Sequence, residues 1–504
     1  MVSTALHEFE DEAPVPSGVA GLDEILVGGF SRSNVHLVEG APGTGKTTLG
    51  LQFLLDGRER GERGLYVTLS ETKRELARSA RTHGWSLDGI EIFELVPPEL
   101  TLDPEQEQTL VYASDLELGE TVSMVRKEVE RVKPERVVFD SVSEIRLLSQ
   151  GSLRYRRQVL ALKNFLALQN CTSLFLDDLT QQAEETSLHS MVHGVVRLHQ
   201  TALQFGGDRR RLQISKLRGR EYKGGFHDFV IRKGGLQVFP RLIAAEHERH
   251  FSPTEPVSSG IGELDALLGG GLSRGTSTLI MGPSGTGKSS LTLQIIDAAL
   301  KRGEKVLIVS FDETRRVLMA RAEGLSIDLG PPMASGQLTL QHIDPAELSP
   351  GQLIGMIRQH VEDGVQVVAL DSLTGYQNAM PEESYLILHM HELLSYLGQQ
   401  GVMTLLVLAQ HGLVGPMQSS VDLTYISDTV LLLRFFEASG KIRRAMSVMK
   451  KRTGPHEETI REFRISSDGL RVGPALEQFH GVLTGVPAFS GPPSTLLEPK
   501  PDEA

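Results

Sequence analysis

Cysteine is almost absent from this sequence. Cys171 is the only one among 504 residues, so no disulfide can form within the chain. Apolar runs of the ~20 residues that a membrane-spanning helix needs are also missing. Residues 1–16 are acidic and lack the apolar centre of a signal peptide. These absences predict a protein of the reducing cytoplasm, without a membrane segment.

Basic and aromatic residues are scarce as well. Lys and Arg number 51 against 64 Asp and Glu, which leaves a net charge of −13, and Phe, Tyr and Trp make up only 5%. An acidic surface repels nucleic acid and anionic membranes unless basic residues gather in one patch. The composition therefore argues against nucleic acid as a partner. With 40% hydrophobic residues, the chain is long enough for two or three globular domains.

What the chain does contain is a glycine-rich loop that occurs twice, as GAPGTGKT from Gly40 and as GPSGTGKS from Gly282. Each copy follows an apolar run and precedes a helix-like run, the context of a phosphate-binding loop. Its backbone curls around an anion, and the helix N-terminus adds positive potential. Two complete copies exclude a chance glycine-rich turn. The predicted ATP-binding residues are Gly40, Gly43, Thr44, Gly45, Lys46, Thr47 and Thr48 in the first copy, and Gly282, Gly285, Thr286, Gly287, Lys288, Ser289 and Ser290 in the second.

The repeat extends beyond the loops. The spacing is 242 residues both from Lys46 to Lys288 and from Asp23 to Asp265. The chain is therefore predicted to hold two nucleotide-binding domains. Its predicted parts are a flexible acidic tail over 1–16, a first domain over 17–241, a linker over 242–255, a second domain over 256–473, and a mobile tail over 474–504.

Short apolar runs alternate with helix-like runs in each predicted domain. In the first domain, strands are expected over 64–69 and 136–139, and helices over 119–132 and 154–169. This alternation predicts an α/β fold, with a mostly parallel sheet and helices on both faces. Residues 195–239 hold short alternating runs between glycine pairs, which predicts antiparallel hairpins at the sheet edge. The second half repeats this order.

Aspartates at two strand ends are the candidate metal ligands. Asp140 and Asp371 each end an apolar run and are each followed by serine. That position suits a carboxylate linked to Mg²⁺ opposite the hydroxyl of Thr47 or Ser289. The alternative is an ordinary aspartate that caps the next helix.

Glutamates at two other strand ends are the candidate catalytic groups. Glu71 and Glu313, the latter beside Asp312, also sit at strand ends, which a parallel sheet is expected to place on the same side as the phosphate loop. Each carboxylate is placed to polarise a water in line with the γ-phosphate. The alternative is a carboxylate that only stabilises the first turn of a helix.

Basic residues recur on late strands of both halves, as Lys216 with Arg218 and as Lys450 with Arg452. One interpretation is that they protect an edge strand from pairing. The other is that they reach the γ-phosphate held by a neighbouring subunit, a contact worth on the order of a thousandfold in rate. The spacing by itself favours neither interpretation.

Taken together, these residues resemble the KaiC family of circadian-clock ATPases, in the RadA/KaiC branch of the RecA-like ATPases. The resemblance runs from Ser17 to Gly473 and rests on the two loops, on VTLSETKRELARSARTHGW, on LQISKLRG, and on ISDTVLLL followed by KKRTGPHEETIREF. It implies two RecA-like domains and a double-ring homo-hexamer with ATP at subunit interfaces. It also implies Kai-type or other signalling proteins as partners, catalytic roles for Glu71 and Glu313, and action in trans for the four basic residues.

The chain departs from the family pattern at two places. The family has two adjacent glutamates after the second strand, where this chain has Ser70-Glu71 and Asp312-Glu313. The family's second ring phosphorylates itself at a Ser-Thr pair, where this chain has Thr424-Tyr425. Thr424 is the predicted main phosphoacceptor, because the Tyr425 hydroxyl lies farther from the backbone. Alternatively, both are ordinary residues that enter a strand.

We interpret the chain as a Mg·ATP-dependent hexameric ATPase whose second ring is a serine/threonine kinase acting on itself. A DNA-dependent motor or recombinase shares the same core, but the net acidity and the lack of a Lys/Arg-rich loop with interleaved aromatics count against it. A nucleotide-gated signalling scaffold without kinase activity is the third interpretation. Transfer of labelled γ-phosphate separates the first interpretation from the third.

Overall fold

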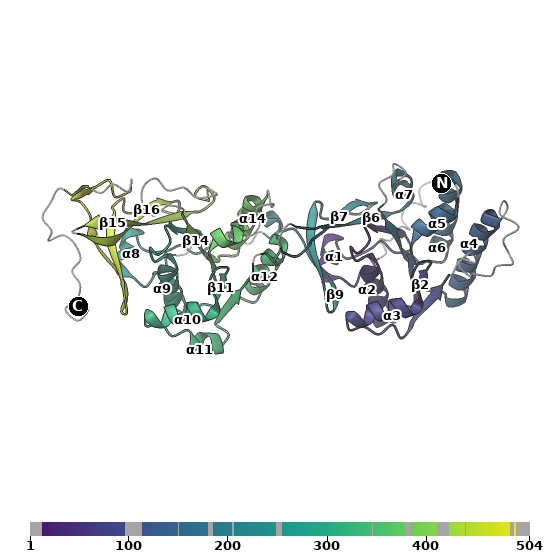
Figure 1. Ribbon diagram of the computed structural model, residues 1–504, viewed down its shortest axis with the longest axis horizontal. Helices are drawn as coiled ribbons and strands as arrows, with labels where there is room; N and C mark the ends of the chain where they lie inside the picture. The colour runs from purple at the N-terminus through teal and green to yellow at the C-terminus, as the bar shows by residue number, and fades with distance from the viewer. Residues whose placement is uncertain are drawn as a thin grey trace, which may run out of the picture. The chain divides into compact units, whose positions relative to one another are not determined.

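The computed structural model describes residues 13–95, 113–149, 151–179, 185–203, 206–247, 255–344, 346–378, 385–410, 423–438, 440–483 and 488–489. The chain divides into two units between Arg241 and Leu242. Each unit is built around its own nine-stranded sheet with helices on both faces (Figure 1). The predicted tandem α/β fold is confirmed.

The first sheet is parallel on one side and antiparallel on the other. Its strand order is β3-β2-β4-β5-β1-β6-β7-β8-β9. Neighbours from β3 to β6 run parallel, and β6 to β9 are joined antiparallel, which confirms the predicted edge hairpins. The strands are β1 Val35–Gly40, β2 Gly64–Thr68, β3 Ile90–Glu94, β4 Arg136–Asp140, β5 Thr172–Asp178, β6 Gly194–Thr201, β7 Arg209–Leu217, β8 Phe226–Arg232 and β9 Gly235–Phe239.

Two layers of helices cover this sheet. Helices α1, α2 and α3 pack on one face over a core that includes Leu49, Phe53 and Leu76. Helices α4 to α7 pack on the other face, over a core that includes Val129 and Leu162. Strands β1, β2 and β4 are buried along their whole length, as expected for a parallel sheet that is covered twice. The helices are α1 Ala20–Ile25, α2 Lys46–Glu59, α3 Lys73–Thr82, α4 Ala113–Val132, α5 Val142–Leu148, α6 Ser152–Leu168 and α7 Glu185–Met191.

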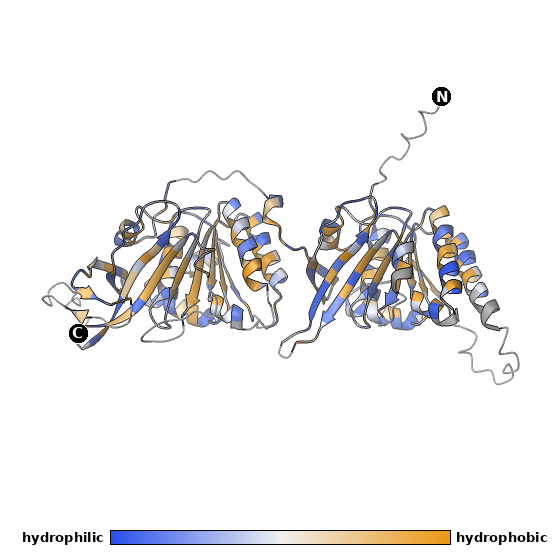
Figure 2. Ribbon diagram, turned by 90° about the horizontal axis from the view of Figure 1, so that it is seen from above, coloured by the Kyte–Doolittle hydropathy of each residue, from blue (hydrophilic) through white to orange (hydrophobic). Residues whose placement is uncertain are grey.

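The second unit repeats the first strand for strand. Its order is β12-β11-β13-β14-β10-β15-β16-β17-β18, again parallel as far as β15 and antiparallel beyond it. Figure 2 shows mostly apolar strands between helices of mixed polarity in both units. The strands are β10 Ser277–Gly282, β11 Val306–Ser310, β12 Leu338–His342, β13 Val367–Asp371, β14 Met403–Ala409, β15 Thr429–Ala438, β16 Lys441–Lys451, β17 Arg461–Ser466 and β18 Gly469–Ala475.

Helices cover both faces of the second sheet too. Their ends carry recognisable signals, such as the capping box in which Ser349 and Gln352 bond each other's backbone N–H at the start of α12. None of the described helices is long and apolar enough to cross a membrane. The helices are α8 Gly262–Leu267, α9 Lys288–Lys301, α10 Arg315–Gly324, α11 Gly330–Ala334, α12 Pro350–Glu362, α13 Leu373–Asn378 and α14 Leu386–Gln399, with a short 3₁₀ helix η2 at Ala244–His247.

The structure corrects the predicted linker over 242–255. Leu242 and Ala244 are buried in the core of the second unit. The Ala244 N–H donates to Glu392 on α14 at 3.0 Å, and the His247 ring lies against Tyr396. The beginning of this segment is therefore part of the second unit, because its apolar side chains pack there.

The beginning of the predicted tail over 474–504 is also part of the second unit. Leu476, Phe479 and Val482 are buried in a small core with Phe436 and Ala445 of β15 and β16. A two-stranded pairing of β19 Phe479–His480 with β20 Ala488–Phe489 follows. The prolines and acidic residues of this segment suggested a tail, but its few apolar residues cover the end of the sheet. Residues 1–12 and 490–504 of the predicted tails lie outside the described part of the chain.

Candidate active site

Each glycine-rich loop joins a central strand, β1 or β10, to a buried helix, α2 or α9. The residue before the helix is Gly45 in one unit and Gly287 in the other, with φ of 103° and 102°. Glycine adopts this left-handed conformation at little cost. Neither helix has a side-chain cap at its start, so its first N–H groups are free to bind an anion in the loop. We call these loops the first site and the second site.

The two loop lysines are held differently. Lys46 donates from Nζ to the carbonyl oxygens of the first two loop residues, at 2.8 and 3.0 Å, and pairs with Asp178 at 2.8 Å. Lys288 bonds the same two positions of its own loop, at 2.9 and 2.8 Å. Burial lowers the pKa of Lys288 to about 8, and the charge of Asp371 opposes the shift. The two lysines therefore make the same contacts to the loop backbone, but Lys46 is also paired with a carboxylate.

The predicted metal ligands lie next to each other. Thr47 donates from its hydroxyl to Asp140 Oδ2 at 3.1 Å, and the Tyr66 hydroxyl donates to the same oxygen at 2.6 Å. Burial raises the pKa of Asp140, and these two hydrogen bonds oppose the shift. In the second site Ser289 bonds Asp371, whose pKa burial also raises. Each pair offers the hydroxyl and carboxylate oxygens that Mg²⁺ prefers.

The predicted catalytic carboxylates are placed differently in the two units. Burial raises the pKa of Glu71, and the negative charge of Asp140 raises it further, so its carboxylate holds a proton more readily than a free glutamate does. Glu313 instead forms an ion pair with Arg321, and Asp312 accepts a hydrogen bond from Ser372 at 2.5 Å. The two carboxylates of the second unit therefore face different partners.

The four predicted trans-acting residues lie at the opposite end of the strands from the loops. Lys216 pairs across β7 and β6 with Val195, and Lys450 pairs across β16 and β15 with Val430, near the amino ends of β6 and β15. These strands run parallel to β1 and β10, whose carboxyl ends carry the loops. Along the strands, three residues, or about 10 Å, separate the position of Lys216 or Lys450 from the first residue of the loop in the same unit. A loop and the basic residues of the same unit are therefore not brought together.

Within the chain, these basic side chains bond backbone carbonyls. Lys216 donates to the carbonyls of His189 and Val192, and Arg218 to that of Ser190 at 2.8 Å. In the second unit, the Lys450 ammonium and the Arg452 guanidinium do the same to the turn that precedes β15. Their acceptors are the carbonyls of Thr424 and Ser427 for Lys450, both at 2.7 Å, and that of Tyr425 for Arg452, at 2.5 Å.

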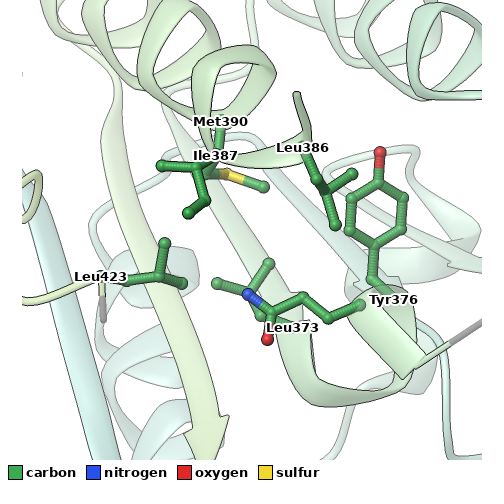
Figure 3. Close-up of a pocket in the computed structure, with 7 residues that line it drawn as sticks. Leu373, Tyr376, Leu386, Ile387, Met390 and Leu423 are labelled. Carbon is green, nitrogen blue, oxygen red and sulfur yellow. The ribbon is translucent and has the colours of Figure 1, made fainter. Parts of the chain in front are cut away.

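The predicted phosphoacceptors lie in that turn. Thr424 is half-buried and Tyr425 is exposed. Leu423, just before them, lines one side of an apolar pocket whose other walls come from α13 and α14 (Figure 3). Because Lys450 and Arg452 hold the turn by its carbonyls, both hydroxyl side chains are presented from an anchored backbone.

Three polar residues at or beside the first site were missed from the sequence. Tyr66 lies inside an apolar strand run and gave no signal. Asp178 is the last residue of β5, so the strand-end reasoning that selected Asp140 would have found it. Glu39, beside the first loop, is 3% exposed and accepts hydrogen bonds from His189 at 2.8 Å and Arg197 at 2.6 Å. A single glutamate in an apolar run does not reveal partners 150 residues away.

Comparison with known proteins shows which family this sequence matches. The family model of the KaiC ATPase matches residues 15–243 and again residues 257–477. The circadian clock protein KaiC3 of Synechocystis is 27% identical over 495 residues, covering 96% of each chain. The circadian clock oscillator protein KaiC of Thermostichus vulcanus is 26% identical, over 94% of this chain and 91% of the relative. That of Synechococcus elongatus is 26% identical, over 95% and 93%.

The matched residues cover both units and include both loops, the strand-end carboxylates and the basic residues of β7 and β16. The predicted resemblance is confirmed along nearly the whole chain. This protein belongs to the KaiC family of ATPases.

Proposed function

We propose that this protein assembles into a homo-hexamer and hydrolyses Mg·ATP between neighbouring subunits, at both sites. The observation that supports this most strongly is the separation of each loop from the basic residues of its own unit. In each unit, the loop lies on one surface, and Lys216 or Lys450 lies on another. The two surfaces meet in a head-to-tail contact between two copies of the chain, and such a contact forms a ring when the rotation between subunits closes.

The residues around each loop fit a magnesium ion. Thr47 with Asp140, and Ser289 with Asp371, would hold it, and when bound it would neutralise charge on the phosphates. In the first site Glu71 would accept a proton from the attacking water. Lys46 or Lys288 would hold the phosphates of the nucleotide, and the neighbour's basic residues would approach the γ-phosphate.

Tyr66→Phe is expected to lower the Mg²⁺ affinity of the first site about tenfold, since partners that orient a metal ligand typically contribute this much. The substitution removes the hydroxyl that bonds Asp140 and keeps the ring. Magnesium titration of ATP hydrolysis in a chain that also carries Lys288→Ala, so that only the first site turns over, measures the effect. The control is phosphate transfer by the second site in a Tyr66→Phe chain with Lys288 intact, whose magnesium dependence should not change, because Ile308 stands at the corresponding position of β11. An unchanged magnesium dependence would contradict the assignment of Asp140.

Assembly is expected to depend on ATP. Without nucleotide the chain should be monomeric or loosely associated, and a slowly hydrolysed ATP analogue should convert it to a hexamer, because a ligand held between subunits stabilises the assembled state by mass action. Light scattering at micromolar protein, with and without the analogue, measures the particle mass. A particle that stays monomeric with saturating nucleotide would contradict the proposal.

We further propose that the second site transfers phosphate to Thr424 of a neighbouring subunit. The anchored turn and the short arm of Thr424 support this, since transfer needs an oxygen held in line with the γ-phosphate. Tyr425 projects its oxygen farther from the same backbone. The relatives from Thermostichus vulcanus and Synechococcus elongatus are circadian clock oscillator proteins, so nucleotide-driven timing or signalling with Kai-type partners is the proposed cellular role.

One observation favours a second candidate function, a nucleotide-gated scaffold without kinase activity. The proposed base Glu313 is paired with Arg321, which occupies an oxygen that a base needs. Labelled γ-phosphate transferred to the chain would favour the kinase. Nucleotide-dependent assembly without any transfer would favour the scaffold.

A further inference from the structure

The two sites differ in one charge that touches the loop lysine. In the first unit β5 pairs with β1 so that Asp178 lies opposite Gly40, the first residue of the loop. In the second unit β14 pairs with β10 so that Ala409 lies opposite Gly282. The carboxylate of the first site is therefore a methyl group in the second, at the same place in the sheet.

Asp178 uses the donor of Lys46 that a phosphate would need. An ammonium group has three donors. Two donors of Lys46 bond loop carbonyls, and the third is directed to Asp178 Oδ1 at 2.8 Å. The Lys46 side chain is only 9% exposed, so water screens this pair weakly, although Asp178 itself is 41% exposed. Among the residues that the structure describes, no carboxylate forms an ion pair with Lys288.

We propose that Asp178 competes with the nucleotide phosphates for Lys46 and so makes the first site the weaker of the two nucleotide sites. An incoming triphosphate must displace the carboxylate or bind beside it, and either step costs affinity because both groups are negative. Ala409 imposes no such cost on the second site. This inference rests on the proposed function, that both loops bind ATP, and it assigns Asp178 as the residue that separates their affinities.

Asp178→Asn tests the competition. In a full-length chain that carries Lys288→Ala, only the first site reports, and a fluorescent ATP analogue gives its affinity. Removing the charge is expected to tighten binding about tenfold, the scale of a close and partly screened charge pair. The matched control is Glu91→Gln, which removes one exposed carboxylate on β3 and should leave the affinity unchanged. Binding is measured with Mg²⁺ and again with EDTA.

The reciprocal variant is Ala409→Asp in a chain that carries Lys46→Ala, where only the second site reports. It is expected to weaken binding about tenfold, because it places a carboxylate beside Lys288. Thermal unfolding of each variant shows whether the chain is folded.

The outcomes separate this inference from the proposed function. Unchanged or weaker binding by Asp178→Asn would overturn the role of Asp178 and leave the ATP site intact. Weaker binding only when Mg²⁺ is present would instead assign Asp178 to the metal. The first site could also fail to bind the analogue with either Asp or Asn at position 178, while the second site binds it. That result would show that the first loop is not a nucleotide site, and it would overturn this inference as well.

Discussion

A chain that carries Lys288→Ala is expected to transfer no measurable phosphate to Thr424, while Lys46→Ala is expected to remove nucleotide from the first site and most of the assembly. Each lysine is the buried cation of its loop, and it makes charge-assisted hydrogen bonds that neither water nor alanine replaces. We expect losses of at least about a hundredfold for each. The two effects differ because the proposed kinase chemistry belongs to the second site.

Phosphopeptide mapping after incubation with labelled Mg·ATP measures the first effect, and light scattering measures the second. Lys305→Ala is a suitable control, because Lys305 is exposed and its ammonium group bonds the carbonyl of Asp363, away from both loops. Glu313→Gln should also reduce transfer while nucleotide still binds. Phosphate on Thr424 in the Lys288→Ala chain would show that the second site is not the kinase, and phosphate on Tyr425 alone would contradict the argument from side-chain length.

Two inactive chains are expected to restore each other's activity when they are mixed. Glu71→Gln removes the proposed base of the first site and leaves Lys46 to bind the nucleotide, and the double substitution Lys216→Ala with Arg218→Ala removes the basic residues of the same unit. With Lys288→Ala in both chains, each should hydrolyse ATP on the order of a thousandfold more slowly. In random mixed rings about a quarter of the interfaces combine an intact Glu71 with intact basic residues, because the two surfaces come from successive subunits.

Recovery of activity toward that fraction, after the chains are mixed without nucleotide and then assembled, measures action in trans. Mixing two batches of the same inactive chain is the control and should recover nothing. If mixed rings form and stay inactive, the basic residues do not act on a neighbour's nucleotide. Full activity of the double variant by itself would show that Lys216 and Arg218 serve only to anchor the carbonyls of α7.

Much of the fold could be predicted because the same alternation of apolar runs and helix-like runs occurs twice in the chain. The apolar runs in β4 and β10 are unbroken, which is typical of a parallel sheet that is covered on both faces. The ends of the domains were less predictable. Leu242 begins a segment rich in His and Glu, and Phe479 stands between polar residues, and only the three-dimensional packing shows that each completes a core.

The candidate site was predictable where chemistry depends on local spacing. The glycines, the lysine and the hydroxyl of each loop must lie within one turn of chain to bind one phosphate group, so the sequence by itself determined them. The strand-end aspartates followed from the parallel sheet, whose strands end on one side. The role of Glu71 followed from its strand end and from the family resemblance. The action of the four basic residues in trans followed from the resemblance, and both roles stay predictions.

Only the tertiary structure decided which charges face each loop. Tyr66, Asp140 and Asp178 come from three different strands, and their distances to the loop depend on strand order and register, which local spacing does not encode. The same packing placed Lys216 and Lys450 at the end of the sheet away from the loops of their own units. The sequence determined that this chain has two phosphate-binding loops. The fold decided that the two loops are electrostatically unequal, because a one-residue difference, Asp178 against Ala409, lies directly beside them.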